Sequence, residues 1–201
     1  MNEAADTPDY LQLPLSRFLG LVASGDPAPA GGSVAAVAVA LAAALSAMAA
    51  RLSAKHLADA PKLAKRADSL RSEAAPLARA DAAAYGRVLA AQRTGEGDVF
   101  RGALSQAADI PVAVAEAGVE VAEVSAYLAR DGNPNLKGDA IAAALLAEAG
   151  VRAATRLAKI NLSGAGIEDG RRARADELVE VAAAARRAAE DMSQGTSRRW
   201  Q

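Results

Sequence analysis

The stretch DPAPAGGSVAAVAVALAAALSAMAA, residues 26–50, decides the fold class of this chain. It begins with a proline- and glycine-containing turn and continues as a long alanine-rich run that carries no charge after Asp26. Glycines at the start of a helix leave backbone N–H groups free and let a ligand come close, so the turn is a candidate anion-binding site. A helix that is apolar all round must be buried. The stretch therefore predicts a binding site on the core, or on a subunit interface, of a helical protein.

The composition predicts one all-α domain, a bundle of about five to six long helices, some of them kinked at proline. A compact chain of 201 residues buries roughly 70% of its unfolded surface, so a core needs neither metal nor disulfide. Hydrophobic residues make up 52% of the chain but aromatic residues only 3%, so small side chains fill the core and helices approach closely. The net charge of -1 removes the electrostatic argument for nucleic-acid binding, and the lack of cysteine excludes a disulfide framework and thiol catalysis.

Two segments bear on the cellular location of the protein. The start of the chain, MNEAADTPDYLQ, is acidic and has no apolar core of its own, which argues against a secretory signal peptide. The uncharged run from Pro27 to Ala50 is long enough to span a membrane, but it is mostly alanine, which drives insertion weakly. We therefore expect a buried central helix, no membrane association and a cytoplasmic protein.

Turn residues divide the chain into helical segments. We expect a short amphipathic helix at 15–24 with Leu15, Phe18, Leu19 and Val22 on one side, a central helix at about 31–55, a helix from Asp59 to about Ala91 kinked at Pro76, a helix at about 99–130 bent at Pro111, a helix at 136–162 capped by Asn135, and a charged helix from Ile167 to about Met192. No alternating β-pattern competes with these segments. Residues 1–201 are expected to form a single domain, irregular at 1–14 and frayed at 193–201.

Few residues can carry chemistry. His56 is the only histidine, and a lone histidine is more often a surface or capping residue. No cluster has metal-ligand spacing, so no metal site is expected. Asp81 lies among alanines with Tyr85 one turn on, so its carboxylate either faces inward, with a raised pKa, or shares a solvated face with neighbouring arginines. Asp139 falls in the first turn of its helix, where a carboxylate also simply offsets the helix dipole.

Several motifs follow one another in an order that resembles the cyclodeaminase/cyclohydrolase family. They are GDPAPAGGSVAA (25–36), DAAAY (81–85), GNPN (132–135) with Asp139 four residues on, LLAEA (145–149) and INL (160–162). The family comprises the cyclodeaminase domain of formimidoyltransferase-cyclodeaminase and the stand-alone bacterial methenyltetrahydrofolate cyclohydrolases. The likeness covers about residues 15–192. PxGGSVAA and GNPNxxxD are its specific parts, and the alanine-rich sequence between them is not specific.

The resemblance implies an all-helical homodimer that binds a reduced folate, as substrate, at or near the subunit interface, without a prosthetic group. It implies acid/base or cation-stabilising roles for Asp81 and Asp139. Lys159 would hold a carboxylate of the glutamate tail as a point charge. The substrate-binding residues that it implies are Gly31, Gly32, Ser33, Tyr85, Asn133, Asn135, Lys159 and Asn161.

The chain departs from the family pattern at four places. Ala30 stands where the family has a third glycine, and a Leu-Pro-Lys element after the Asp81 helix is replaced by QRTGEGD (92–98). Arg93 is the nearest substitute for the lysine of that element. The family also favours arginine at the position of Lys159 and serine at that of Gly138.

The leading functional hypothesis is hydrolysis of 5,10-methenyltetrahydrofolate to 10-formyltetrahydrofolate. It needs a base-activated water and carboxylates that stabilise a cationic one-carbon centre. One alternative is cyclodeamination of formimidoyltetrahydrofolate, in which N10 attacks the formimino carbon and ammonia leaves. The other is a helical dimer that binds a folate or small anion without catalysis.

Overall fold

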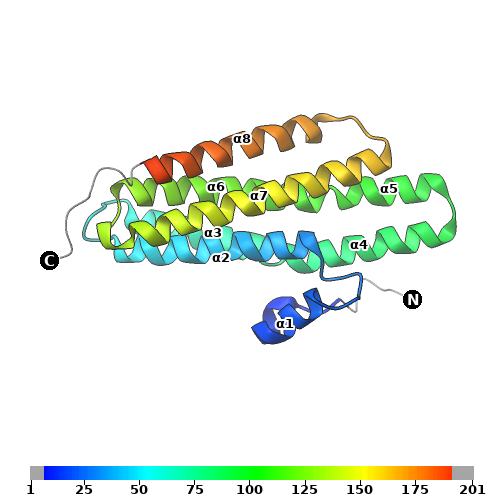
Figure 1. Ribbon diagram of the computed structural model, residues 1–201, viewed down its shortest axis with the longest axis horizontal. Helices are drawn as coiled ribbons and strands as arrows, with labels where there is room; N and C mark the ends of the chain where they lie inside the picture. Colours follow the sequence, from blue (N-terminus) through cyan, green and yellow to red (C-terminus); the bar gives the residue numbers. More distant parts are fainter. Residues whose placement is uncertain (1–6, 192–201) are drawn as a thin grey trace.

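The computed structural model describes residues 7–191, and this range contains helices but no β-strand (Figure 1). The α-helices are α1 (Leu15–Val22), α2 (Gly31–Leu52), α3 (Ala60–Ala74), α4 (Leu77–Thr94), α5 (Gly97–Ala107), α6 (Asp109–Asp131), α7 (Lys137–Ala165) and α8 (Gly170–Asp191). Two 3-10 helices are η2 (Tyr10–Gln12) and η3 (Pro134–Leu136). The expected all-α bundle is confirmed. The expected frayed end at 193–201, and residues 1–6 of the expected irregular lead, lie outside the described residues.

Two pairs of helices follow one another along the long axis of the bundle, α3 with α4 and α5 with α6 (Figure 1). The kink expected at Pro76 is a full break, because α3 ends at Ala74 and α4 begins at Leu77. The bend expected at Pro111 lies earlier, at Ala108. Proline lacks an N–H but fits the first turn of a helix, and Pro111 occupies that turn in α6.

Helix α2 lies at the centre of the bundle and packs against α3, α4, α6 and α7. Twelve of its 22 residues are buried, nine of which are hydrophobic and mostly alanine. It is long and apolar enough to cross a membrane by length and composition, but 61% of its most apolar window is buried inside the bundle. The prediction of a buried central helix is confirmed.

Val39 shows how closely the central helices approach. A Cβ added to Gly118 on α6 would lie 3.2 Å from Val39 Cγ2, and one added to Gly150 on α7 would lie 2.7 Å from the same methyl. The two glycines therefore admit one branched side chain of α2 between α6 and α7. Close backbone packing of this kind is what the alanine-rich, aromatic-poor composition predicts.

Helix α1 lies beside the bundle, next to the start of α2 (Figure 1). Only Phe18 of its expected apolar side is buried, whereas Leu15 and Leu19 are 68% and 56% exposed. Phe18 packs on Tyr10 of η2, with ring centroids 5.8 Å apart. The amphipathic helix was predicted correctly, but residues 7–191 leave most of its apolar side uncovered.

Candidate functional site

Asp81 lies directly on the glycine start of α2. A Cβ added to Gly32 would lie 2.0 Å from Asp81 Oδ1, so only glycine leaves room for the carboxylate. The Ser33 hydroxyl donates hydrogen bonds to Ala78 O (2.7 Å) and to Asp81 Oδ2 (3.2 Å). The break at Pro76 starts α4 here, and two segments 48 residues apart in sequence meet. Gly32, Ser33 and Asp81 are among the site residues that the sequence analysis named, and the fold brings them together.

The carboxylate of Asp81 takes the place that the sequence suggested for an anionic ligand. Helix α2 has no side-chain cap from Ala30, the residue before its first turn, and the Ser33 backbone N–H instead donates to Asp81. The free N–H groups of the helix start are thus partly used by the protein itself. The turn holds a carboxylate rather than offering an open anion cradle.

Burial raises the pKa of Asp81 above its ordinary value, although the hydrogen bonds from the Ser33 hydroxyl and backbone oppose the shift. The inward-facing reading of Asp81 is correct, because the carboxylate lies on Gly32 and accepts from the Ser33 hydroxyl of α2. A raised pKa lies closer to neutral pH, and this suits a carboxyl group that accepts a proton and returns it.

A cleft of about 280 Å³ opens beside Asp81. Its lining residues are Ala30, Gly31, Gly32, Asp81, Ala84, Tyr85, Ala107, Pro111, Leu157, Ile160 and Asn161. Most of this lining is apolar, and the polar side chains are Asp81, Tyr85 and Asn161. A mostly apolar cleft with a few convergent polar groups is typical of a site for a small organic molecule. We call it the Asp81 cleft.

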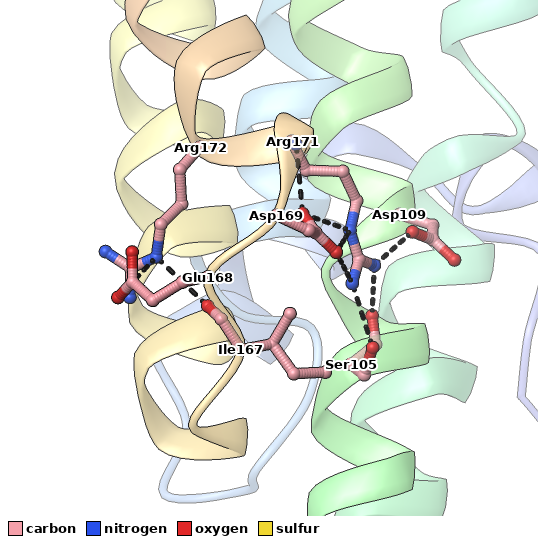
Figure 2. A network of polar contacts seen from close by, with 7 residues as sticks. All are labelled: Ser105, Asp109, Ile167, Glu168, Asp169, Arg171 and Arg172. Carbon is pink, nitrogen blue, oxygen red and sulfur yellow. Dashed lines mark hydrogen bonds and ion pairs between the residues drawn. The ribbon is translucent and has the colours of Figure 1, made fainter.

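One wall of the Asp81 cleft is fixed by Arg171, which the sequence analysis did not single out. Arg171, at the start of α8, donates to Ser105 O (2.8 Å), Ser105 Oγ (2.9 Å) and Asp109 Oδ1 (2.6 Å), as Figure 2 shows. Asp169 binds the same guanidinium, which lowers the pKa of that carboxyl. These contacts hold the α5–α6 junction, which carries Ala107 of the cleft, against the start of α8. An arginine in a polar stretch gives no sequence signal for such a role.

The GNPN turn lies at the opposite end of the bundle from the Asp81 cleft. Asn133 donates from Nδ2 to Leu52 O (3.1 Å) and from its backbone N to Ser53 Oγ (2.9 Å), which ties the turn to the C-terminal end of α2. Its own side chain accepts from Asn135 N (3.0 Å). The expected cap is therefore wrong: Asn133 caps η3, and α7 follows without a side-chain cap.

Asp139 is separated from the Asp81 cleft within one chain. It lies in the first turn of α7, and Asn161, which lines the cleft, lies 22 residues further along the same helix. At 1.5 Å per residue the separation is about 33 Å. Folding of a single chain does not bring Asp139, Asn133 or Asn135 to Asp81, contrary to the expectation of one converging cleft. Their roles in binding or catalysis stay predictions.

Three other predicted or considered residues also lie away from the cleft. Lys159 forms an ion pair with Asp176 of α8 and faces a separate groove between α7 and α8. Arg93 lies in the last turn of α4. His56 is exposed in the turn that follows α2. Among residues 7–191, no group of three or more His, Asp or Glu side chains is arranged to hold a metal ion.

The fold and the cleft together define an all-α protein that carries a half-buried carboxylate at the edge of a small-molecule site. Comparison with known proteins identifies the family within this class. The family model described as formiminotransferase-cyclodeaminase matches residues 14–186. The chain belongs to the formiminotransferase-cyclodeaminase family, as the sequence resemblance predicted.

A solved structure supports the same assignment. The crystal structure of formiminotetrahydrofolate cyclodeaminase from Thermotoga maritima is similar to this chain, with a TM-score of 0.82 and 28% sequence identity. The match covers 92% of this chain and 98% of that one. No curated protein matches the chain significantly. The protein is thus a folate-related enzyme of the cyclodeaminase type.

Proposed function

We propose that the protein is a formimidoyltetrahydrofolate cyclodeaminase and that Asp81 is its proton carrier. The observation that carries the proposal is the half-buried Asp81 carboxylate, which lies against Gly32 at the edge of an apolar cleft. The similar solved enzyme, described as a formiminotetrahydrofolate cyclodeaminase, favours this reaction over the hydrolysis that the sequence put first. A substrate bound in the Asp81 cleft would contact Asn161 and Tyr85 as neutral hydrogen-bonding groups.

The reaction needs one proton to move between two nitrogens. N10 of the substrate adds to the cationic formimino carbon, and the new N10–C bond leaves N10 with an excess proton. Asp81 takes that proton and delivers it to the amino nitrogen on the same carbon. The C–N bond to this nitrogen then breaks, ammonia leaves, and the carbon becomes the 5,10-methenyl cation. A carboxyl whose pKa is raised by burial suits both halves of this transfer, and its negative charge stabilises the cationic carbon.

The second candidate, hydrolysis of 5,10-methenyltetrahydrofolate to 10-formyltetrahydrofolate, uses the same carboxylate. Water adds to the methenyl carbon while Asp81 takes a proton from it. Asp81 then protonates N5 as the N5–C bond breaks, the hydroxyl on the same carbon loses its proton to solvent, and the formyl group stays on N10. Both reactions therefore need a buried proton carrier beside a cationic carbon. The third candidate, a folate-binding dimer without catalysis, is motivated by the departures at Ala30 and at residues 92–98.

One spectroscopic experiment separates the three candidates, because the 5,10-methenyl product absorbs in the near ultraviolet and the other folates do not. A rise in this absorbance from 5-formimidoyltetrahydrofolate supports the cyclodeaminase. Loss of absorbance from 5,10-methenyltetrahydrofolate, faster than the spontaneous decay, supports the hydrolase. Calorimetric binding without either change indicates a non-catalytic binder.

The role of Asp81 is tested by an Asp→Asn variant, with the same substitution at an aspartate outside the Asp81 cleft as the matched control. Asp81→Asn is expected to lower the rate by at least the 10² that a proton-transfer group contributes, about two orders of magnitude. Asp98→Asn, at the exposed start of α5, is expected to leave the rate unchanged. Equal rates for the two variants would overturn the role of Asp81.

We further propose that a second copy of the chain covers the exposed face of α2. This face repeats every seven residues, at Val34, Leu41 and Met48, which are 39%, 58% and 37% exposed, and it carries no charge. Leu145 and Leu146 on the adjacent α7 are 42% and 40% exposed. A heptad-spaced apolar stripe on a helix is typical of a helix–helix interface. A twofold axis near Leu41, in the middle of α2, would pair the stripe with itself in antiparallel orientation.

Such pairing would complete the site across the two subunits. The end of α2 at Leu52 would lie beside Gly31 of the other copy, and Asn133 is hydrogen-bonded to Leu52. The GNPN turn and Asp139 of the partner subunit would then lie near the Asp81 cleft. This arrangement accounts for the two separated halves of the predicted site. It also places the folate at the interface, and the buried α2 is consistent with the proposed cytoplasmic location.

Mixing two inactive variants tests the shared site. Asp81→Asn and Asp139→Asn are each expected to be inactive, and a mixed dimer of the two has one site with both aspartates intact. An equal mixture, after subunit exchange, should recover about a quarter of the wild-type activity if subunits pair at random. No recovery from dimers shown to have exchanged, by co-purification of two differently tagged subunits, would overturn the shared site. Leu41→Asp should give a monomer, and a variant that stays dimeric would exclude the α2 face.

A further inference from the structure

Ser33 contacts the carboxylate of the site but not the space beside it. Its side chain is fully buried, with an exposed fraction of 0%, and it does not line the Asp81 cleft, although Gly31 and Gly32 before it do. A buried hydroxyl normally forms its hydrogen bonds inside the protein. The family resemblance implied that Ser33 contacts the substrate. Within one chain, its side chain is instead placed to act on Asp81.

The Ser33 hydroxyl links Asp81 to the turn of α4 that precedes it. This hydroxyl carries one proton, which it shares between Ala78 O at 2.7 Å and Asp81 Oδ2 at 3.2 Å. Ala78 comes three residues before Asp81, so both acceptors belong to one turn of α4. The backbone N–H of Ser33 also donates to Asp81. The side chain and the backbone of one residue of α2 thus fix the carboxylate relative to both helices.

The two oxygens of the Asp81 carboxylate have different surroundings. Oδ2 accepts the hydrogen bond from the Ser33 hydroxyl. Oδ1 lies closer to Gly32, because a Cβ added there would lie 2.0 Å from Oδ1 and 2.6 Å from Oδ2, and Gly32 lines the cleft. A carboxyl group can carry a proton on one oxygen while the other accepts a hydrogen bond. The Ser33 contact therefore leaves Oδ1 for proton exchange.

We propose that Ser33 is a positioning residue of the enzyme, whose hydroxyl holds Asp81 Oδ2 so that Oδ1 is the oxygen that takes the proton and returns it. This role rests on the proposed function, in which Asp81 is the proton carrier. Ser33 acts through Asp81, so its loss changes turnover more than substrate binding. A direct contact with the substrate would instead raise KM. A purely structural link between α2 and α4 would change stability alone.

Ser33→Ala separates these possibilities, with Ser46→Ala as the matched control. Ser46 lies on the same helix, about 20 Å further along, and is also 0% exposed. Its hydroxyl donates to Ala42 O (2.9 Å) and contacts Ser125 Oγ (2.8 Å), away from the Asp81 cleft. Both variants therefore remove a buried, hydrogen-bonded hydroxyl from α2. The measurements are kcat and KM from the methenyl absorbance, over a range of pH.

Ser33→Ala should lower kcat roughly tenfold to hundredfold, which is the effect of losing a hydrogen bond to a charged group. Its KM should stay close to that of the wild type, because the Ser33 side chain does not line the cleft. Ser46→Ala should keep the wild-type kcat and KM, although it removes an equally buried hydroxyl.

The pH profile is the measurement that a purely structural role would not change. Burial raises the pKa of Asp81, and the hydrogen bonds from Ser33 oppose this shift. Without the hydroxyl the pKa rises further, so the acid limb of the kcat/KM profile should move to higher pH in Ser33→Ala and stay in place in Ser46→Ala. Two tyrosines are close to Asp81: Tyr85 lines the cleft, and Tyr10 of η2 has a pKa raised by burial and by the charge of Asp81. Tyrosine ionises only near pH 10, so neither contributes to the acid limb.

A lower kcat, an unchanged KM and a displaced acid limb in Ser33→Ala alone support the positioning role. An acid limb that stays in place, or a raised KM at unchanged kcat, overturns this role and leaves the proposed function intact. A wild type that acts on neither 5-formimidoyltetrahydrofolate nor 5,10-methenyltetrahydrofolate overturns both. Should Ser33→Ala fail to fold, Ser33→Cys gives the same test, because it has a similar shape and is a much weaker donor.

Discussion

Replacing Gly32 by alanine tests the contact on which the whole site depends. The new Cβ would lie 2.0, 2.4 and 2.6 Å from Oδ1, Cγ and Oδ2 of Asp81, whereas ordinary contact begins at 3.4 Å. The carboxylate must therefore retreat by about 1.4 Å, and the 3.2 Å hydrogen bond from Ser33 is lost. A displacement of about 1 Å at a reacting group costs on the order of 10²-fold in rate. Overpacking costs about 1–3 kcal/mol of folding free energy, partly offset by the better helix propensity of alanine.

The assay compares kcat/KM of Gly32→Ala with that of Gly86→Ala, using the methenyl absorbance. Gly86 lies on the same helix as Asp81, and a Cβ added there meets nothing within 4 Å. We expect a loss of about two orders of magnitude for Gly32→Ala and wild-type activity for Gly86→Ala. Denaturant unfolding of both variants would show that the loss is not one of folding. Equal activity of the two variants would refute the argument that the carboxylate must rest on Gly32.

Three further predictions concern stability. Because burial raises the pKa of Asp81, its contribution to stability is complete below the ordinary value of 3.8 and is lost as pH rises through the raised value. Unfolding free energies measured by urea should thus favour Asp81→Asn over wild type increasingly from acid to neutral pH, and a constant difference would contradict this. Gly118→Ala places a Cβ 2.6 Å from Val151 Cγ2, and it should cost about 1–3 kcal/mol by the same measurement. Ser53→Ala removes the acceptor of the Asn133 N–H and should cost about 1–3 kcal/mol, with faster hydrogen exchange at that amide as the direct readout.

The helices could be read from the sequence because proline, glycine and the alanine-rich runs act locally. The expected central helix at 31–55 ends three residues earlier in the structure, at Leu52. The break near Pro111 was misplaced by three residues, because a proline that bends a helix in one context begins a helix in another. The apolar side of α1 predicted a helix correctly but not its burial. Burial depends on what covers that side, and no local pattern encodes that.

The site was predictable only where a motif marks it. Gly32, Ser33 and Asp81 lie in motifs, and the structure brings them together. Lys159 was expected in the cleft, but it lies on another side of α7. Leu157, Ile160 and Asn161 line the cleft. Lys159 comes two positions after Leu157, so its side chain points about 200° away around the helix.

Long-range placement explains what sequence reasoning missed. Arg171 acts through Ser105 and Asp109, which lie more than 60 residues away in sequence. Contacts of this kind leave no periodic trace in the sequence. Asp139 is separated from Asp81 because α7 is long and runs away from the cleft. The sequence predicted the length of this helix but not its direction in the bundle.

The alanine-filled centre determines how this protein responds to mutation. In most domains the damaging core changes are truncations that open holes, because large side chains fill the interior. Here the fully buried positions are mostly alanines, whose side chains offer only one methyl group to remove. Examples with no exposed surface are Ala36, Ala42, Ala43, Ala143 and Ala144. Larger side chains are therefore the destabilising changes, because neighbouring backbones cannot separate without moving whole helices. Substitutions therefore have more freedom on the exposed faces of the helices than between them, where a single added methyl group requires neighbouring helices to move.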